Sequence, residues 1–99
     1  MYAIVRESTI RPGAQDQLNA GRNEFAALRA QQPGYQGSVV IDAGNGRMLT
    51  IGFWDSEQSE QAARAILQPA AERLMTPHLT ASPQVTAQGQ VVANDLTTR

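Results

Sequence analysis

The chain of 99 residues contains no cysteine and no lysine, and it has only one histidine and five aromatic residues. Without cysteine it cannot form disulfides, iron–sulfur clusters or thiolate zinc sites. A single histidine cannot build a usual zinc or non-haem iron site either. We therefore predict no metal and no cofactor.

Charge and long apolar runs are also scarce. The eight arginines are spread from Arg6 to Arg99 and the net charge is -1, so the basic patch of a nucleic-acid-binding protein is missing. No 18 apolar residues follow one another, which predicts no membrane span. The first ten residues carry Arg6 and Glu7 within their apolar run, unlike a secretory signal. We expect a cytoplasmic protein.

Hydrophobic periodicity predicts six elements in the order β-α-β-β-α-β. Strands are expected at residues 2–10, 35–42, 47–54 and 84–93, and helices at 14–32 and 57–67. Pro69 should kink or interrupt the second helix before residues 70–75 resume a helical turn or two. Gly44-Asn45-Gly46 suits a tight hairpin with positive φ angles. Ser56 is a candidate N-cap, and Glu57 and Glu60 then lie near the positive end of the helix.

This order of elements predicts an α+β, ferredoxin-like fold, with a four-stranded antiparallel sheet in the order 4-1-3-2 and both helices on one face. We expect one domain over residues 1–93 and a loose C-terminal tail over 94–99.

The alternation of the strands leads to a prediction for each face of the sheet. We expect Leu49, Ile51 and Phe53 to face the helices. The uncovered face would then hold Tyr2, Ile4, Arg6, Ser8, Met48, Thr50 and Trp54. Exposed apolar surface forfeits roughly 25 cal/mol per Å², so we expect a homodimer that packs sheet against sheet.

Three short motifs carry a resemblance to a known family. They are Arg11-Pro12-Gly13 before the first helix, Gln32-Pro33-Gly34-Tyr35 before the second strand, and Leu49-Thr50-Ile51 followed by Trp54-Asp55-Ser56. Over residues 2–92 the chain resembles the antibiotic biosynthesis monooxygenase family. The resemblance implies a homodimeric α/β barrel with a pocket between sheet and helices in each subunit. Members include cofactor-independent oxygenases of aromatic polyketides, haem-degrading enzymes, quinol oxygenases and proteins with no established activity.

The chain departs from the functional residues of two branches of that family. The haem-degrading branch has an asparagine on its first strand and a histidine on its second helix, but this chain has no asparagine before Ile10 and has Arg64 at the histidine position. Haem degradation is thus disfavoured. The polyketide-oxidising branch has an asparagine where this chain has Thr50.

Three residues are candidates for chemistry, and each also has a structural interpretation. Trp54 could stack on an aromatic substrate or belong to the core. Arg6 could steady a phenolate or form a salt bridge with Glu7, Asp42 or Asp55. His78 could carry a proton near neutral pH or lie exposed in a loop after Pro77. The predicted substrate-binding residues are Trp54, Thr50, Met48 and Ile4, and the predicted catalytic residues are Arg6 and His78.

Two functions remain open at this point. The first is a cofactor-independent monooxygenase-like protein acting on a small aromatic or quinol-type substrate. The alternative is a non-catalytic barrel that binds a small apolar molecule or has a structural role. A cavity of roughly 300 Å³ or more, with Trp54 and Arg6 on its wall, would favour a ligand.

Overall fold

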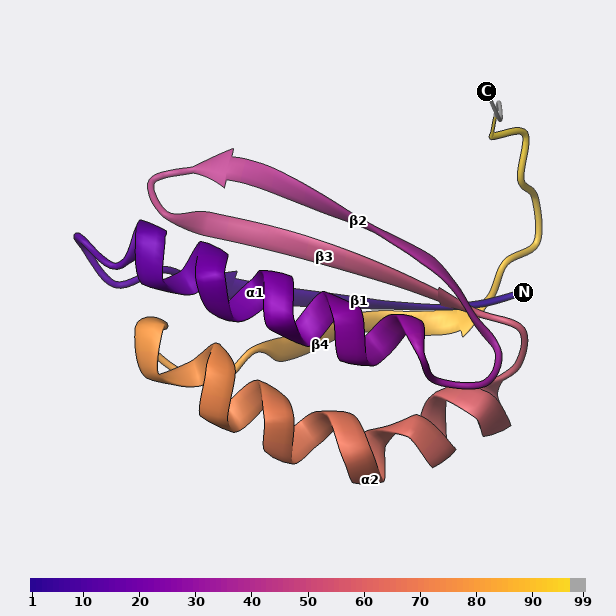
Figure 1. Ribbon diagram of the computed structural model, residues 1–99. Helices are drawn as coiled ribbons and strands as arrows, with labels where there is room; N and C mark the ends of the chain where they lie inside the picture. The colour runs from indigo at the N-terminus through magenta and orange to yellow at the C-terminus, as the bar shows by residue number, and fades with distance from the viewer. Residues whose placement is uncertain (97–99) are drawn as a thin grey trace.

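The computed structural model describes residues 1–96 and has the six predicted elements in the predicted order (Figure 1). They are β1 (Tyr2–Thr9), α1 (Gln15–Ala30), β2 (Tyr35–Gly44), β3 (Arg47–Trp54), α2 (Glu57–Leu74) and β4 (Gln84–Gln90), with a short 3₁₀ helix, η1 (Thr76–His78), after α2. The sheet order is β2-β3-β1-β4 and all neighbours are antiparallel. The ferredoxin-like fold and the strand order are confirmed.

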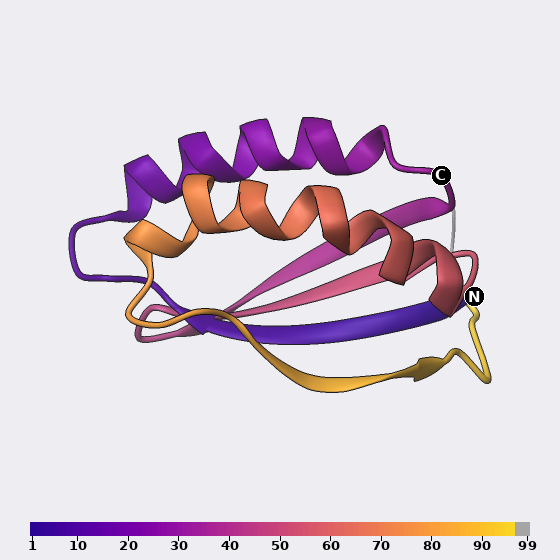
Figure 2. The ribbon, with the colours of Figure 1, turned by 90° about the horizontal axis from the view of Figure 1, so that it is seen from below.

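Both helices cover the same face of the sheet, and the opposite face is open (Figure 2). α1 and α2 also pack on each other, where Gly21 of α1 meets the Leu74 backbone at the end of α2. A Cβ atom at Gly21 would lie 2.0 Å from the Leu74 carbonyl oxygen. This glycine therefore allows close approach of the two helices.

The β2–β3 hairpin forms as predicted. Asn45 has φ 57° and Gly46 has φ 78°, so both central residues lie in the left-handed region that this connection requires. The turn fixes the register in which Val40 lies opposite Thr50 and Asp42 opposite Met48.

The start of α2 is confirmed and its interruption is not. The Ser59 N–H donates to Ser56 Oγ at 3.1 Å, so Ser56 is the N-cap. The helix runs without a break through Pro69 to Leu74. A proline removes one backbone donor from the helix and leaves the carbonyl four residues earlier without its bond. Here that residue, Ala65, is exposed together with Pro69, so water can reach the freed carbonyl.

The prediction of which strand residues face the helices was wrong, because the two faces of β1 and β3 are exchanged relative to it. Tyr2 pairs with Trp54, and Ile4 pairs with Gly52; Tyr2, Ile4 and Trp54 are at most 4% exposed beneath the helices. Leu49, Ile51 and Phe53 point away from the helices, to the open face. β3 has large apolar residues on both faces, so alternation alone could not choose between them.

The core under the helices consists of two clusters. One holds Trp54 with its buried partners Tyr2, Ile4, Phe25, Ala63 and Leu67, and the other holds Leu18, Met48 and Leu79. Ile66 of α2 lies outside these clusters and is 52% exposed.

The chain ends are less regular than predicted. β4 stops at Gln90, and residues 91–96 of the predicted strand end and tail have no regular structure; residues 97–99 lie outside the described residues. One domain over residues 1–93 stays a prediction. No helix within residues 1–96 is long and apolar enough to span a bilayer.

Candidate functional site

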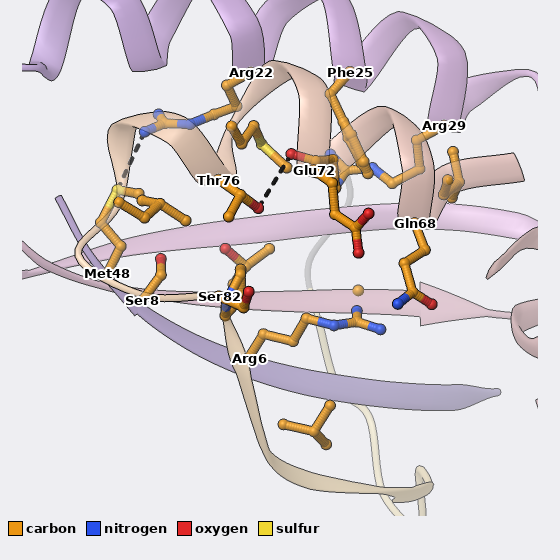
Figure 3. Close-up of a pocket in the computed structure, with 18 of the residues that line it drawn as sticks. Arg6, Ser8, Arg22, Phe25, Arg29, Met48, Gln68, Glu72, Thr76 and Ser82 are labelled. Atoms are coloured by element: carbon orange, nitrogen blue, oxygen red, sulfur yellow. Dashed lines mark hydrogen bonds between the residues drawn. The ribbon is translucent and has the colours of Figure 1, made fainter.

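A cavity of about 380 Å³ lies between the helices and the covered face of the sheet. The sheet contributes Arg6, Ser8, Val40, Met48, Thr50, Gly52, Trp54 and Val85, and the helices contribute among others Leu18, Arg22, Phe25, Arg29, Glu60, Arg64, Leu67, Gln68 and Glu72. In Figure 3, Arg6 points into this space from β1, and Gln68 and Glu72 point into it from α2.

Trp54 closes the end of the cavity near the start of α2. Its ring meets the Tyr35 ring edge-on, with centroids 5.3 Å apart and planes at 68°. Gly52 lies beside the indole, because a Cβ atom there would be in ordinary van der Waals contact with Trp54 Nε1 at 3.6 Å. An aromatic edge-to-face pair restrains the indole in one orientation. Trp54 is 4% exposed, so its indole forms a fixed part of the wall.

A buried carboxylate joins two arginines beside this surface. Glu60 is 2% exposed. Its Oε1 accepts from Arg64 Nε at 2.7 Å and lies 3.4 Å from Arg6 Nη2. The longer separation is an ion pair rather than a close hydrogen bond.

The positions of these groups shift the pKa values of both arginines. Burial lowers the pKa of Arg6, although the charge of Glu60 opposes this. The hydrogen bond to Glu60 raises the pKa of Arg64. Both guanidinium groups stay charged near neutral pH, so the cavity presents cations to a ligand.

Two further arginines approach from α1. Arg22 Nη2 lies 3.1 Å from Met48 Sδ (Figure 3). Arg29 Nη2 donates to Ser38 Oγ at 2.9 Å, and its guanidinium lies 5.4 Å from the centroid of the Phe25 ring. Such cation–π contacts hold a guanidinium flat against an aromatic face.

The structure brings together four of the six predicted site residues. Arg6, Met48, Thr50 and Trp54 line the cavity. Ile4 is only 1% exposed; it lies opposite Gly52 in the sheet and packs in the core cluster of Trp54 rather than on the cavity wall.

His78 is the sixth predicted site residue, and it lies in η1 outside the cavity wall. There its backbone carbonyl accepts from the Arg11 N–H at 2.9 Å. Its role as a proton carrier stays a prediction that this position does not support.

The predicted partners of Arg6 were wrong. Glu7 follows Arg6 on the strand and therefore points to the opposite face, where it accepts from Arg47 Nε at 2.8 Å. Glu60, interpreted from sequence as a helix-dipole residue, is the acid that reaches Arg6.

The sequence analysis also missed the arginines of α1. Leu18, Arg22, Phe25 and Arg29 follow one another at spacings of four, three and four, which place them on one helix face. That spacing could have indicated that both arginines face the sheet. A charged residue is, however, first interpreted as solvent-exposed, even next to apolar residues on a helix.

We also searched the described side chains for a group that could hold a metal ion. Among residues 1–96, no three histidine, aspartate or glutamate side chains gather closely enough to hold a metal ion.

Comparison with solved structures shows the same fold. SnoaB from Streptomyces nogalater, a cofactor-independent oxygenase, is 20% identical with a TM-score of 0.72, over 94% of this chain and 97% of that one. The Rv0793 protein of Mycobacterium tuberculosis is 16% identical with a TM-score of 0.76, over 94% and 96% of the two chains. The NE2512 protein of Nitrosomonas europaea, of unknown function, is 17% identical with a TM-score of 0.72, over 99% and 95%. At these identities the likeness shows the fold alone.

Sequence comparison gives the family. No curated protein matches this sequence. The family model described as antibiotic biosynthesis monooxygenase matches residues 1–66, from the start of the chain to just past the middle of α2, and includes the Trp54-Asp55-Ser56 motif. Since that match covers two thirds of the sequence and the fold agrees with it over the remainder, the chain belongs to the antibiotic biosynthesis monooxygenase family.

Proposed function

We propose that this chain is a cofactor-independent monooxygenase whose substrate is a small electron-rich aromatic or quinol-type molecule. The observation that supports this most is the cavity of about 380 Å³ with Trp54 and Arg6 on its wall. This volume falls within the usual range of small-molecule sites, which is about 300 to 1,000 Å³. The oxygenase activity of SnoaB, which has the same fold, is consistent with it.

In this proposal the pocket orients a substrate that itself reduces dioxygen. Trp54 stacks against the ring, and Arg6 stabilises the phenolate as the substrate loses its proton. Thr50, opposite Arg6 in the sheet, and Met48, two residues earlier on β3, line the same cavity. On a benzylic methylene, two hydrogens leave, one oxygen atom becomes the new carbonyl, and the second oxygen atom leaves in water. His78 and Ile4 do not contact the substrate in this scheme, because neither lines the cavity.

Oxygen uptake with anthrones or hydroquinones tests the proposal. We expect uptake by the parent protein, less by Trp54→Phe, and none above background by Trp54→Ala. Trp54 is buried, so circular dichroism must show that each variant is folded. Equal rates in the parent, the alanine variant and buffer would refute the enzyme.

A ligand-binding protein without turnover is the second candidate. Thr50 and Arg64 favour it, because the catalytic branches that the sequence resembles have asparagine and histidine there. Saturable binding of the same aromatic molecules with no oxygen uptake would identify this case.

We also propose that two copies pair through the open face of the sheet. This face carries Ala3 and Val5 of β1, Val39 and Ile41 of β2, Leu49, Ile51 and Phe53 of β3, and Ala87 of β4, according to the strand register. Val39 is 46% exposed and Ile41 is 42% exposed. A contiguous apolar sheet face in water is unusual for a monomer.

Sedimentation equilibrium tests the pairing. At micromolar concentration the parent should have twice the chain mass of 10.7 kDa, and Ile51→Asp should have the mass of one chain. Gln61→Glu, on the exposed side of α2, is the control and should keep the mass of the parent. A parent mass of one chain would refute the pairing.

A further inference from the structure

One carboxylate oxygen of Glu60 has no hydrogen-bond partner, although Glu60 lies on the wall of a cavity that four arginines also line. Its Oε1 takes both arginine contacts, and its Oε2 is buried with no hydrogen-bond partner. A helix dipole stabilises carboxylates that remain in water, so it does not explain burial of this one. A buried acceptor without a donor is unfavourable. The site therefore lacks one hydrogen-bond donor.

Arg29 on the same wall has the complementary feature, a hydrogen-bond donor without an acceptor. Its Nε is buried with no partner, although Nη2 of the same group bonds Ser38. Its guanidinium is held between two rings, 5.4 Å from the Phe25 centroid and 5.2 Å from the Tyr35 centroid. The site thus also lacks one acceptor near an aromatic surface.

The charge of the wall indicates what would supply both groups. Four arginines and two glutamates line the cavity, whereas the whole chain has a net charge of -1. An arginine fork matches a carboxylate. A ligand group that pairs with a carboxylate oxygen must be a donor, and a hydroxyl is the donor that a phenolic or quinol-type substrate carries. The terminal torsion of Glu60 is soft, so its carboxylate can turn Oε2 toward a ligand. Arg29 has guanidinium N–H groups beyond the one that bonds Ser38, and these can donate to a ligand.

We propose that the cavity binds an aromatic hydroxy acid, whose hydroxyl donates to Glu60 Oε2 and whose carboxylate is held by Arg29 and its neighbouring arginines. This rests on the proposed function, because the ligand occupies the same cavity and stacks on the same Trp54. It adds a specificity residue, Glu60, that distinguishes a hydroxyl from groups that cannot donate.

Binding of matched benzoates tests the assignment. Isothermal titration calorimetry would compare 3- and 4-hydroxybenzoate with the corresponding methoxybenzoates and with benzoate. Fluorescence of Trp54, the only tryptophan, gives a second readout from the cavity wall. At least one hydroxybenzoate should bind about tenfold or more tightly than its methoxy partner and benzoate, as expected for a hydrogen bond to a charged group.

Variants show whether Glu60 is the group that responds. Glu60→Gln should lose the preference for the hydroxyl while still binding benzoate, and Arg29→Leu should weaken binding of every carboxylate. Glu57→Gln removes the same charge from an exposed position one turn earlier on α2 and should keep the preference. Circular dichroism checks folding, and the comparison on the parent protein remains decisive if Glu60→Gln does not fold.

The outcomes separate this inference from the proposed function. Equal binding of hydroxy and methoxy acids by the parent, or a preference that survives in folded Glu60→Gln, would overturn the inference. Failure of every benzoate to bind would overturn it as well. Oxygen uptake with uncharged hydroquinones or anthrones would still support the proposed function in each of these cases.

Discussion

Replacement of Gly21 by alanine tests the contact that holds the two helices together above the cavity. Gly21 is in the interior of α1, where alanine is normally favoured by about 1 kcal/mol over glycine. Judged by helix propensity alone, Gly21→Ala should stabilise the protein.

The packing predicts the opposite sign. The new methyl group would lie 2.0 Å from the Leu74 carbonyl oxygen and 2.9 Å from its carbonyl carbon. These are backbone atoms, so relief requires that the end of α2 move away from α1. Overpacking typically costs about 1 to 3 kcal/mol, and the contact here is with backbone and very short. We expect a net loss of about 1 to 2 kcal/mol after the gain in propensity.

Urea denaturation followed by circular dichroism measures this loss. Ala20→Gly, at the exposed neighbouring position, measures the propensity term in the same helix and should destabilise by about 1 kcal/mol. If Gly21→Ala raised the free energy of unfolding by the amount that Ala20→Gly lowers it, the close contact with α2 would be refuted.

Three further changes test other contacts. Ser56→Ala should lower the free energy of unfolding by about 1 kcal/mol in urea denaturation, because the Ser59 N–H loses its acceptor; no change would contradict the cap. Burial raises the pKa of Tyr2 above its ordinary value of 10, so the native state holds this proton more tightly than the unfolded state. The stability that this contributes is complete below pH 10 and is lost as the pH rises toward the raised value, by at most about 1.4 kcal/mol per pH unit. The fall in unfolding free energy between pH 8 and pH 11 should be smaller in Tyr2→Phe, and an equal fall would contradict it. Gly52→Val adds methyl groups that face the cavity beside Trp54, so ligand affinity measured by calorimetry should fall about tenfold while the fold is kept; unchanged affinity would place the ligand elsewhere.

Most of the fold could be predicted from the sequence, because it depends on local preferences of single residues and short motifs. Asn45 and Gly46 determine a hairpin by their own backbone preferences, and Ser56 caps a helix through its own side chain. The continuation of α2 through Pro69 was not readable. It depends on whether water reaches the carbonyl of Ala65, which the tertiary structure decides.

The sequence predicted only part of the site, because the site depends on contacts between residues that are distant in sequence. Trp54 and Arg6 are conspicuous as single residues, and both line the cavity. The role of Glu60 depends on Arg6, 54 positions earlier in the chain, and on a helix that covers both. No local pattern distinguishes such a glutamate from one that is solvated at a helix start.

The apolar character of both faces of β3 explains the wrong assignment of the faces. It also allows the proposed pair and the proposed ligand site to be tested separately. β3 is apolar on both faces, as strands covered on both sides are. Trp54 and Thr50 face the cavity, whereas Ile51 and Phe53 face the open side. Because Ile51 lies on the face of the sheet opposite the cavity, Ile51→Asp should separate the proposed pair yet keep ligand affinity within about twofold by calorimetry. If the separated chains folded but lost all affinity, the site would need the second copy, and a cavity complete within one chain would be refuted.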